Sequence, residues 1–331
     1  MHKTKLLVGL WCTLACACGI SYGQTYTTID DPLTVDNTGG GTGIGGISGN
    51  TIVGTYSWGG YDTSAPFMYD GANFATVTLP NDTNQAGANG ISGSTIVGTV
   101  WNGGGDEGFI DDISNQSYTL LVDPLEGASN TEALGVNGDN VVGIYFTAQN
   151  FTGFLYNITS QTFATLTDPL AGTTGIDGTY PTGIYGNTIV GHYINATGSH
   201  GFVYNMATQI YTTLDDPLTV HGTGFLEGSS INGIYGNTYV GDFGTGTNEF
   251  GFIYNGGAFT TLQDPSSTEI TFASGIDGNT VVGTWSDNDI TTHGFELVVP
   301  EPSCVSMLAA GCFALLAGRR CRGRENGHLC I

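Results

Sequence analysis

Aspartates placed just before proline are the residues of this chain that could most readily bind a ligand. Asp-Pro steps recur along the sequence, and in two of them a second aspartate precedes the first; these aspartates are Asp30, Asp31, Asp123, Asp168, Asp215, Asp216 and Asp264. Carboxylate oxygens, with backbone carbonyls and water, are the ligands that Ca²⁺ prefers. Aspartate also favours the turn before proline for purely local reasons. Both roles stay open, with Asp31, Asp123, Asp168, Asp216 and Asp264 as Ca²⁺ candidates, and no other cofactor is expected.

Four histidines lie in the body of the chain: His192, His200, His221 and His293. His200 and His293 each precede a Gly-Phe pair, whereas the corresponding places elsewhere hold Ala65, Glu107, Thr152 and Phe250. No repeated ring of ligands follows from this pattern. Each histidine is therefore interpreted as structural or exposed, with a metal site as the alternative.

Signatures of catalysis are absent from the sequence. It contains no G-x-S-x-G, H-E-x-x-H or EF-hand pattern. Residues 41–46 match G-x-G-x-x-G, but no helix is predicted after them, so they are interpreted as a glycine-rich loop. Glycoside hydrolysis needs two carboxyl groups about 5–10 Å apart, and no acidic pair breaks the repeat described below. The chain is predicted not to be an enzyme.

Charge is distributed very unevenly. The six basic residues end at Lys5 and resume only at Arg319, whereas all of the 29 acidic residues except Glu325 lie between them. A body without Lys or Arg cannot neutralise phosphates, so nucleic acid is excluded as a direct partner. The seven cysteines are likewise confined to the two ends, which excludes a disulfide framework in the body.

The N-terminus has the pattern of a secretory signal peptide. Two lysines precede an apolar run from Leu6 to Ile20, and small residues close it before Gln24. Residues 1–23 are therefore assigned to the signal peptide. Signal peptidase is expected to cut between Gly23 and Gln24.

The C-terminus, residues 299–331, has three consecutive parts. Val299 begins the motif 299–302, which includes Pro300, Glu301 and Pro302; an apolar run covers 304–318, and an Arg-rich tail covers 319–331, beginning with Arg319 and Arg320. An apolar run of this length is short for a stable span, which needs about 20 residues, but basic residues after it mark a cytoplasmic stop. An ordinary C-terminal membrane anchor is the alternative interpretation.

In these three parts the chain resembles the PEP-CTERM sorting signal of Gram-negative bacteria. The resemblance implies transient membrane insertion of 304–318 as a helix, then removal of the tail by an exosortase-type transpeptidase. It further implies a cell-surface or extracellular-matrix location in a bacterium that makes extracellular polysaccharide. The tail after Arg320 is longer and less basic than the usual one.

The body, residues 24–298, is built from a six-fold repeat. The phrase Gly-Asn-Thr-Ile-Val-Gly or a close variant ends at Gly54, Gly98, Gly143, Gly191, Gly241 and Gly283, with spacings of 42 to 50 residues. An x-Phe step (usually Gly-Phe) and, in most units, a Thr-Leu-x-Asp-Pro-like segment follow each phrase. Periods of about 20–50 residues indicate a solenoid, a propeller or an array.

Each repeat is predicted to form four short strands. Gly-Asn within the phrase is typical of a two-residue hairpin turn, because both residues tolerate positive φ. Thr, Ile, Val, Tyr and Phe around it favour strands, and no helical periodicity is present. The glycines are expected to allow close packing between repeats.

The two ends of the body complement each other. The last repeat lacks its fourth strand, and residues 26–33 read as a fourth strand with no repeat before it. Pairing these segments would close a ring and remove exposed edges. The predicted fold is an all-β, six-bladed β-propeller of four-stranded blades whose last blade is built from both ends. Its glycine and Gly-Phe rhythm also resembles HAF-type extracellular repeats, which implies no assigned chemistry.

The leading functional hypothesis is a secreted, non-catalytic scaffold or adhesion module at the bacterial surface. The first alternative is a propeller that binds an extracellular polysaccharide through aromatic side chains, which could equally be core; these are Tyr56, Trp101, Tyr145, Tyr193, Phe243 and Trp285. A secreted hydrolase or lyase is the second alternative, and it would require a non-repeating acid pair in the central channel.

Overall fold

The computed structural model describes residues 25–34, 40–58, 63–80, 85–122, 129–224, 226–268, 270–287 and 291–299. Every helix or strand in this part of the chain is a β-strand. The predicted signal peptide lies outside the described residues, and so does the predicted sorting segment except for Val299. No helix among the described residues is long and apolar enough to cross a membrane.

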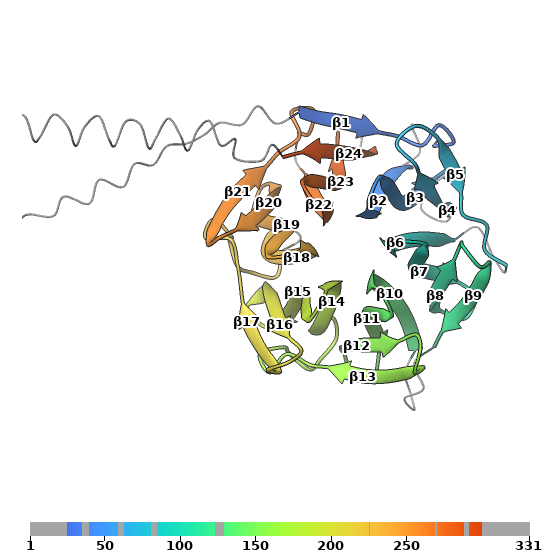
Figure 1. The fold of residues 1–331 in the computed structure, drawn as a ribbon. Coiled ribbons are helices and arrows are strands. Elements are labelled where there is room, and N and C mark those ends of the chain that lie inside the picture. The colour runs from blue at the N-terminus through green and yellow to red at the C-terminus, as the bar shows by residue number, and fades with distance from the viewer. Residues whose placement is uncertain are drawn as a thin grey trace, which may run out of the picture.

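Strands group into six antiparallel blades (Figure 1). Blade I comprises β2 (Gly41–Ser48), β3 (Thr51–Ser57), β4 (Ser64–Tyr69) and β5 (Phe74–Thr76). Blade II comprises β6 (Ala86–Ser92), β7 (Thr95–Trp101), β8 (Asp106–Asp112) and β9 (Ser117–Leu121). Blade III comprises β10 (Ser129–Asn137), β11 (Asn140–Phe146), β12 (Phe151–Asn157) and β13 (Thr162–Leu166).

The second half of the ring repeats the same order. Blade IV comprises β14 (Gly178–Tyr185), β15 (Thr188–Asn195), β16 (Gly198–Asn205) and β17 (Ile210–Thr213). Blade V comprises β18 (Glu227–Tyr235), β19 (Thr238–Thr245), β20 (Glu249–Asn255) and β21 (Ala258–Leu262). Blade VI comprises β22 (Thr271–Asp277), β23 (Thr280–Ser286), β24 (Thr292–Val298) and β1 (Thr25–Ile29).

The ring closes as the sequence predicts. β1 pairs antiparallel with β24 from Thr25 opposite Val298 to Ile29 opposite Gly294. The first strand of every blade lies nearest the centre of the ring, and the fourth strand lies outside (Figure 1). The predicted six-bladed β-propeller is confirmed.

The repeated hairpin turn depends on glycine alone. The first residue of each turn has positive φ, at Gly49, Gly93, Gly138, Gly186, Gly236 and Gly278. The following Asn, Ser or Asp does not, so positive φ occurs only at the first turn position, as in a type II′ turn. The predicted two-residue hairpin turn is thus present, and because only its first residue needs positive φ, the second position can vary.

The second glycine of the phrase makes room for an aromatic ring inside its own blade. Gly98 lies directly opposite Phe109 on the neighbouring strand. A Cβ on Gly98 would lie 2.7 Å from the Phe109 ring and 2.0 Å from the Gly87 carbonyl oxygen. Gly54, Gly143, Gly191, Gly241 and Gly283 face phenylalanines in the same way. The two repeated signatures are therefore cross-strand partners.

A different set of glycines brings the blades together at the axis. Each innermost strand has a register shift just before a glycine, and a Cβ on that glycine would lie within 3.5 Å of the Cα of its counterpart in the next blade; these residues are Gly46, Gly90, Gly135, Gly183, Gly233 and Gly275. The prediction that phrase glycines pack between repeats was wrong in this respect. Residues 41–46 belong to β2 and not to a loop, because this close approach favours glycine within a strand.

Candidate histidine–aspartate site

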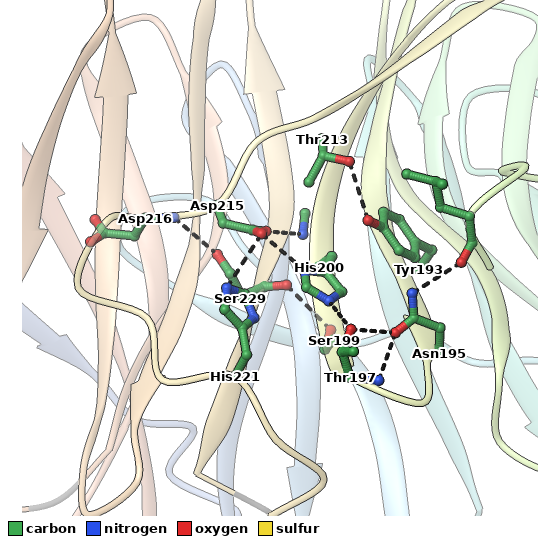
Figure 2. Close-up of polar contacts among 12 residues, drawn as sticks. Tyr193, Asn195, Thr197, Ser199, His200, Thr213, Asp215, Asp216, His221 and Ser229 are labelled. Atoms are coloured by element: carbon green, nitrogen blue, oxygen red, sulfur yellow. Dashed lines mark hydrogen bonds and ion pairs between the residues drawn. The ribbon is translucent and has the colours of Figure 1, made fainter. Parts of the chain in front are cut away.

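His200 lies on β16 at the end of blade IV that carries the connections between blades. Its ring stacks on the Tyr193 ring at 5.1 Å between centroids, with 21° between planes. Its Nδ1 lies 2.9 Å from Oδ2 of Asp215, which directly follows the outer strand of the blade. Gly201 donates its backbone N–H to the other carboxylate oxygen, Oδ1, at 2.8 Å. Asp215 is thus held on one side and presents Oδ2 to the histidine (Figure 2).

The other nitrogen of the His200 ring begins a chain of hydrogen bonds. His200 Nε2 lies 2.8 Å from the Thr197 hydroxyl, and this hydroxyl lies 2.7 Å from Asn195 Oδ1. The Thr197 backbone N–H also donates to Asn195 Oδ1, and the Asn195 amide donates to the Leu170 carbonyl. The turn between β15 and β16 therefore fixes the orientation of the His200 ring.

His221 completes the group from the connection between β17 and β18. Its Nε2 lies 3.6 Å from Asp215 Oδ2, and its ring stacks on His200 at 4.4 Å. The ligand atoms of His200, Asp215 and His221 all lie within 4.8 Å of one another. This is the sole group of three or more such metal-ligating side chains in the described part of the chain.

A related pair occurs where the ring closes. His293 Nδ1 lies 3.0 Å from Asp30 Oδ2, and its ring stacks on Trp285 at 4.3 Å. Its Nε2 faces a second carboxylate, Asp287, at 3.7 Å. His200 and His293 thus occupy equivalent positions, but their outer nitrogens face a hydroxyl and a carboxylate respectively.

His192 has a different character from the other histidines of blade IV. Its ring stacks on Tyr180 at 4.7 Å with 10° between planes. Burial lowers its pKa to about 4, because the charged form would lose its hydration. His192 is therefore neutral at physiological pH, which agrees with the structural interpretation.

The described Asp-Pro aspartates have a clear structural role. Oδ1 of Asp31, Asp168, Asp216 and Asp264 accepts the backbone N–H of the residue two positions later at 2.8 Å. Their own backbone N–H groups donate to a Thr or Ser hydroxyl on the first strand of the next blade, at Thr42, Thr179, Ser229 and Thr271. Each corner therefore links two blades. Asp123, the fifth Ca²⁺ candidate, lies outside the described residues.

An acidic pair does break the repeat, contrary to the sequence expectation. Asp242 on β19 and Glu249 on β20 hydrogen-bond to each other, and Asn232 donates to Asp242 at 2.5 Å. Burial raises the pKa of both carboxyl groups, and the Asp242 charge raises that of Glu249 further. The raised pKa of Glu249 favours its protonated form beside Asp242. The pair was missed because strand register, which sets Glu249 opposite Gly244, had not been assigned.

Most of the aromatic candidates are core residues. Tyr56, Tyr145, Tyr193, Phe243 and Trp285 are buried, with at most 7% of each exposed. Trp101 is 39% exposed. The strand register shows that its buried neighbour Val100, and not Trp101, occupies in blade II the position that the five buried aromatic residues hold in the other blades. Stacking of sugars on these five buried residues is therefore excluded.

Two cavities at the centre of the ring are lined by residues of all six blades, and the one at the hairpin-turn end has a volume of about 190 Å³. The cavity bounded by the axial glycines and their neighbours has a volume of about 70 Å³. Asp242 and Glu249 do not line it. The acid pair thus lies in blade V and outside the axial channel. The hydrolase alternative would need such a pair inside that channel.

Comparison with solved structures agrees with the fold class. The β-propeller domain of the trilobed protease from Pyrococcus furiosus, described as having an open velcro topology, aligns at TM-score 0.50 and 10% identity, covering 78% of this chain and 93% of that chain. A chain of the nidogen/laminin complex gives 0.46 at 9% identity, covering 71% and 85%. An acylaminoacyl peptidase gives 0.45 at 9% identity, covering 74% of this chain and 43% of its own.

The first of these alignments supports the β-propeller class, and at these identities it shows the fold alone. Neither the protein-family models nor the curated proteins gave a match. The residues of the predicted signal cleavage, Gly23 and Gln24, and those of the sorting motif, Pro300, Glu301, Pro302, Arg319 and Arg320, lie outside the described part of the chain.

Proposed function

We propose that this chain is a secreted surface or extracellular-matrix protein whose propeller serves as a non-catalytic scaffold or adhesion module. The observation that carries the proposal is the three-part C-terminus, with Pro300-Glu301-Pro302, the apolar run and the arginines from Arg319 in that order. Exosortase-type and signal peptidases would act on the two ends. A Gram-negative bacterial cell surface is the expected location.

The architecture of the body supports a scaffold role. Six similar blades form a ring that β1 closes by pairing with β24, so blade VI has an outer strand like the other blades. Four corners repeat the same aspartate turn and the same link to the next blade. The cavity at the axial glycines, of about 70 Å³, leaves little room for a ligand in the middle of the ring.

Extracellular polysaccharide is the partner that we propose for this scaffold. The acidic, Lys- and Arg-free body would not be attracted to nucleic acid or to anionic membranes. A dedicated carbohydrate-binding module is the second candidate, but its stacking residues would have to lie outside the five buried aromatic positions. A glycan array with the secreted protein separates the two: specific binding to defined oligosaccharides favours the second.

Intact mass of the protein in cell and medium fractions tests the sorting proposal. We expect a species that begins at Gln24 and ends near Pro302. Glu301→Ala, which alters the sorting motif but not the body, should accumulate with its C-terminal segment retained. A wild-type protein that keeps residues 304–331 in every fraction would contradict exosortase processing and indicate a permanent anchor.

A further inference from the structure

We propose that His200, Asp215 and His221 form a binding site for a divalent transition-metal ion of the Zn²⁺ class. His200 lies on β16, Asp215 lies just after the end of β17, and His221 lies further along the connection that leads to β18. Their facing atoms are His200 Nδ1, Asp215 Oδ2 and His221 Nε2 (Figure 2). This inference does not depend on whether the chain is sorted to the cell surface.

The hydrogen-bond chain determines where the His200 proton lies. The Thr197 backbone N–H donates to Asn195 Oδ1, so this atom is the amide oxygen and can only accept. The Thr197 hydroxyl must then donate to Asn195 and accept from His200 Nε2–H. In neutral His200 the lone pair is therefore on Nδ1.

This lone pair faces another acceptor. Asp215 Oδ2 lies 2.9 Å from His200 Nδ1, and a carboxylate oxygen cannot donate a hydrogen bond to it. Such a contact is favourable only with a proton or a cation between the two atoms. No Lys or Arg exists between Lys5 and Arg319 to supply the charge.

The way in which His200 is held suits a metal ligand. Metal-bound histidine commonly donates its second ring N–H to an oxygen that fixes the ring, as His200 does to Thr197. His221 Nε2 also faces Asp215 Oδ2, at 3.6 Å, so a second imidazole lies within reach of the same ion. The three ligand atoms lie within 4.8 Å of one another.

The connection that carries His221 is fixed on both sides of this residue. Val220 donates its N–H to the Gly244 carbonyl and accepts one from Gly228, both at 2.9 Å. Gly222 packs closely on Gly198. A Cβ added to Gly198 would lie 2.1 Å from the carbonyl oxygen of Gly222. The His221 side chain is 35% exposed, which leaves solvent access for the remaining coordination positions. Binding requires its ring to turn out of the stack with His200.

The ligand set selects the kind of ion. Two imidazoles with one carboxylate suit Zn²⁺, Cu²⁺, Ni²⁺ or Fe²⁺, whereas Ca²⁺ takes six to eight oxygen ligands. His293 provides a contrast within the same molecule. Its two nitrogens face Asp30 and Asp287, so a protonated ring satisfies both carboxylates, and no second imidazole joins this group among the described residues.

Calorimetric titration of the metal-stripped full chain with Zn²⁺ tests the proposal. Because thiolates are good zinc ligands and the two ends of the chain contain cysteines, the informative quantity is the difference between wild type and variants. We expect His221→Ala to lose one site and Thr197→Val to weaken that site by about 10- to 100-fold. His293→Ala should titrate as wild type. Ca²⁺ should give no corresponding signal.

Thermal unfolding provides a second readout that the termini do not dominate. Zn²⁺ should raise the unfolding midpoint of wild type and His293→Ala, because an ion that binds only the folded state stabilises it. It should not raise that of His221→Ala, whose fold is checked by circular dichroism. Zinc titrations and midpoints of His221→Ala that equal those of wild type would overturn the proposal.

Discussion

At the scale of single residues, the repeated phrase encodes a steric fit. The glycine that ends it lies under a phenylalanine ring of the next strand, and no larger residue fits between the ring and the carbonyl oxygen behind it. The phenylalanines at 67, 109, 154, 202, 252 and 295 are all fully buried. The presence of both partners in every blade therefore preserves the packing inside each blade.

The raised pKa of Glu249, which lies beside Asp242, makes the stability of the fold depend on pH. Burial and the Asp242 charge raise the pKa of Glu249, so the folded chain keeps a proton that the unfolded chain releases above about pH 4.3. The folded state then binds more protons, and stability falls as pH rises towards the raised pKa. The slope is at most about 1.4 kcal/mol per pH unit for one proton.

Glu249→Gln should flatten this dependence, because glutamine keeps a donor for Asp242 and does not titrate. Thermal midpoints between about pH 5 and 8 measure the effect, with Glu296→Gln in blade VI as the control. Parallel curves for Glu249→Gln and wild type would contradict the proton assignment.

At the scale of elements, the Asp-Pro corner joins the outer strand of one blade to the inner strand of the next. In blade IV the Asp216 side chain holds the turn, while Asp215 binds His200. The blade I corner has buried Leu79 before Pro80 where others have aspartate, so apolar burial replaces the turn carboxylate there. The first strand of blade II has Ala86 at the position where Thr42, Thr179, Ser229 and Thr271 supply a hydroxyl, so this corner also lacks the hydroxyl link of the other four.

Changes at Asp168 distinguish a turn from a Ca²⁺ ligand. Asp168→Ala leaves the Leu170 N–H without its acceptor and should cost about 1–3 kcal/mol of stability. Asp168→Asn keeps a side-chain oxygen as the acceptor and removes a carboxyl group whose pKa is raised by burial. The stability of this variant should therefore stay near that of wild type. Denaturant unfolding with and without Ca²⁺ measures both. A Ca²⁺-dependent stabilisation that Asp168→Asn abolishes would favour the metal role.

At the scale of the whole molecule, stability depends on closure of the ring. Ile29 on β1 is buried in a cluster with Ile44, Ile47 and Phe67 of blade I. Ring closure is reinforced at the opposite end of the blades, where Asp277 accepts the Gly49 N–H across the blade VI–I junction. Ser48, Ser92 and Asn137 accept the corresponding N–H groups of the next blades.

Ile29→Ala should therefore destabilise the entire propeller by about 2–5 kcal/mol, because the cavity lies at the junction. Leu33→Ala, four residues later and 57% exposed, should change stability by less than about 0.5 kcal/mol. Urea unfolding compares the two. Equal effects would indicate that β1 does not hold the ring closed.

The sequence by itself determined the repeat, the number of blades, the four-strand pattern and the pairing of the two ends. These features follow from local rules, because turn chemistry and period act within about 45 residues of chain. Register also begins locally, since the counterparts of Gly98 always lie five residues after the turn glycine and those of Phe109 lie 16 to 18 residues after it. One further signal was legible: the two blades with histidine before Gly-Phe are those with Asp-Asp-Pro.

Only the tertiary structure decided what these residues contact. It placed His221 beside His200, buried Tyr145 and Trp285, and paired Asp242 with Glu249. It also assigned close packing at the axis to Gly46 and its counterparts. Such contacts depend on how blades face one another and on the path of irregular connections, and neither is set by the period of the repeat.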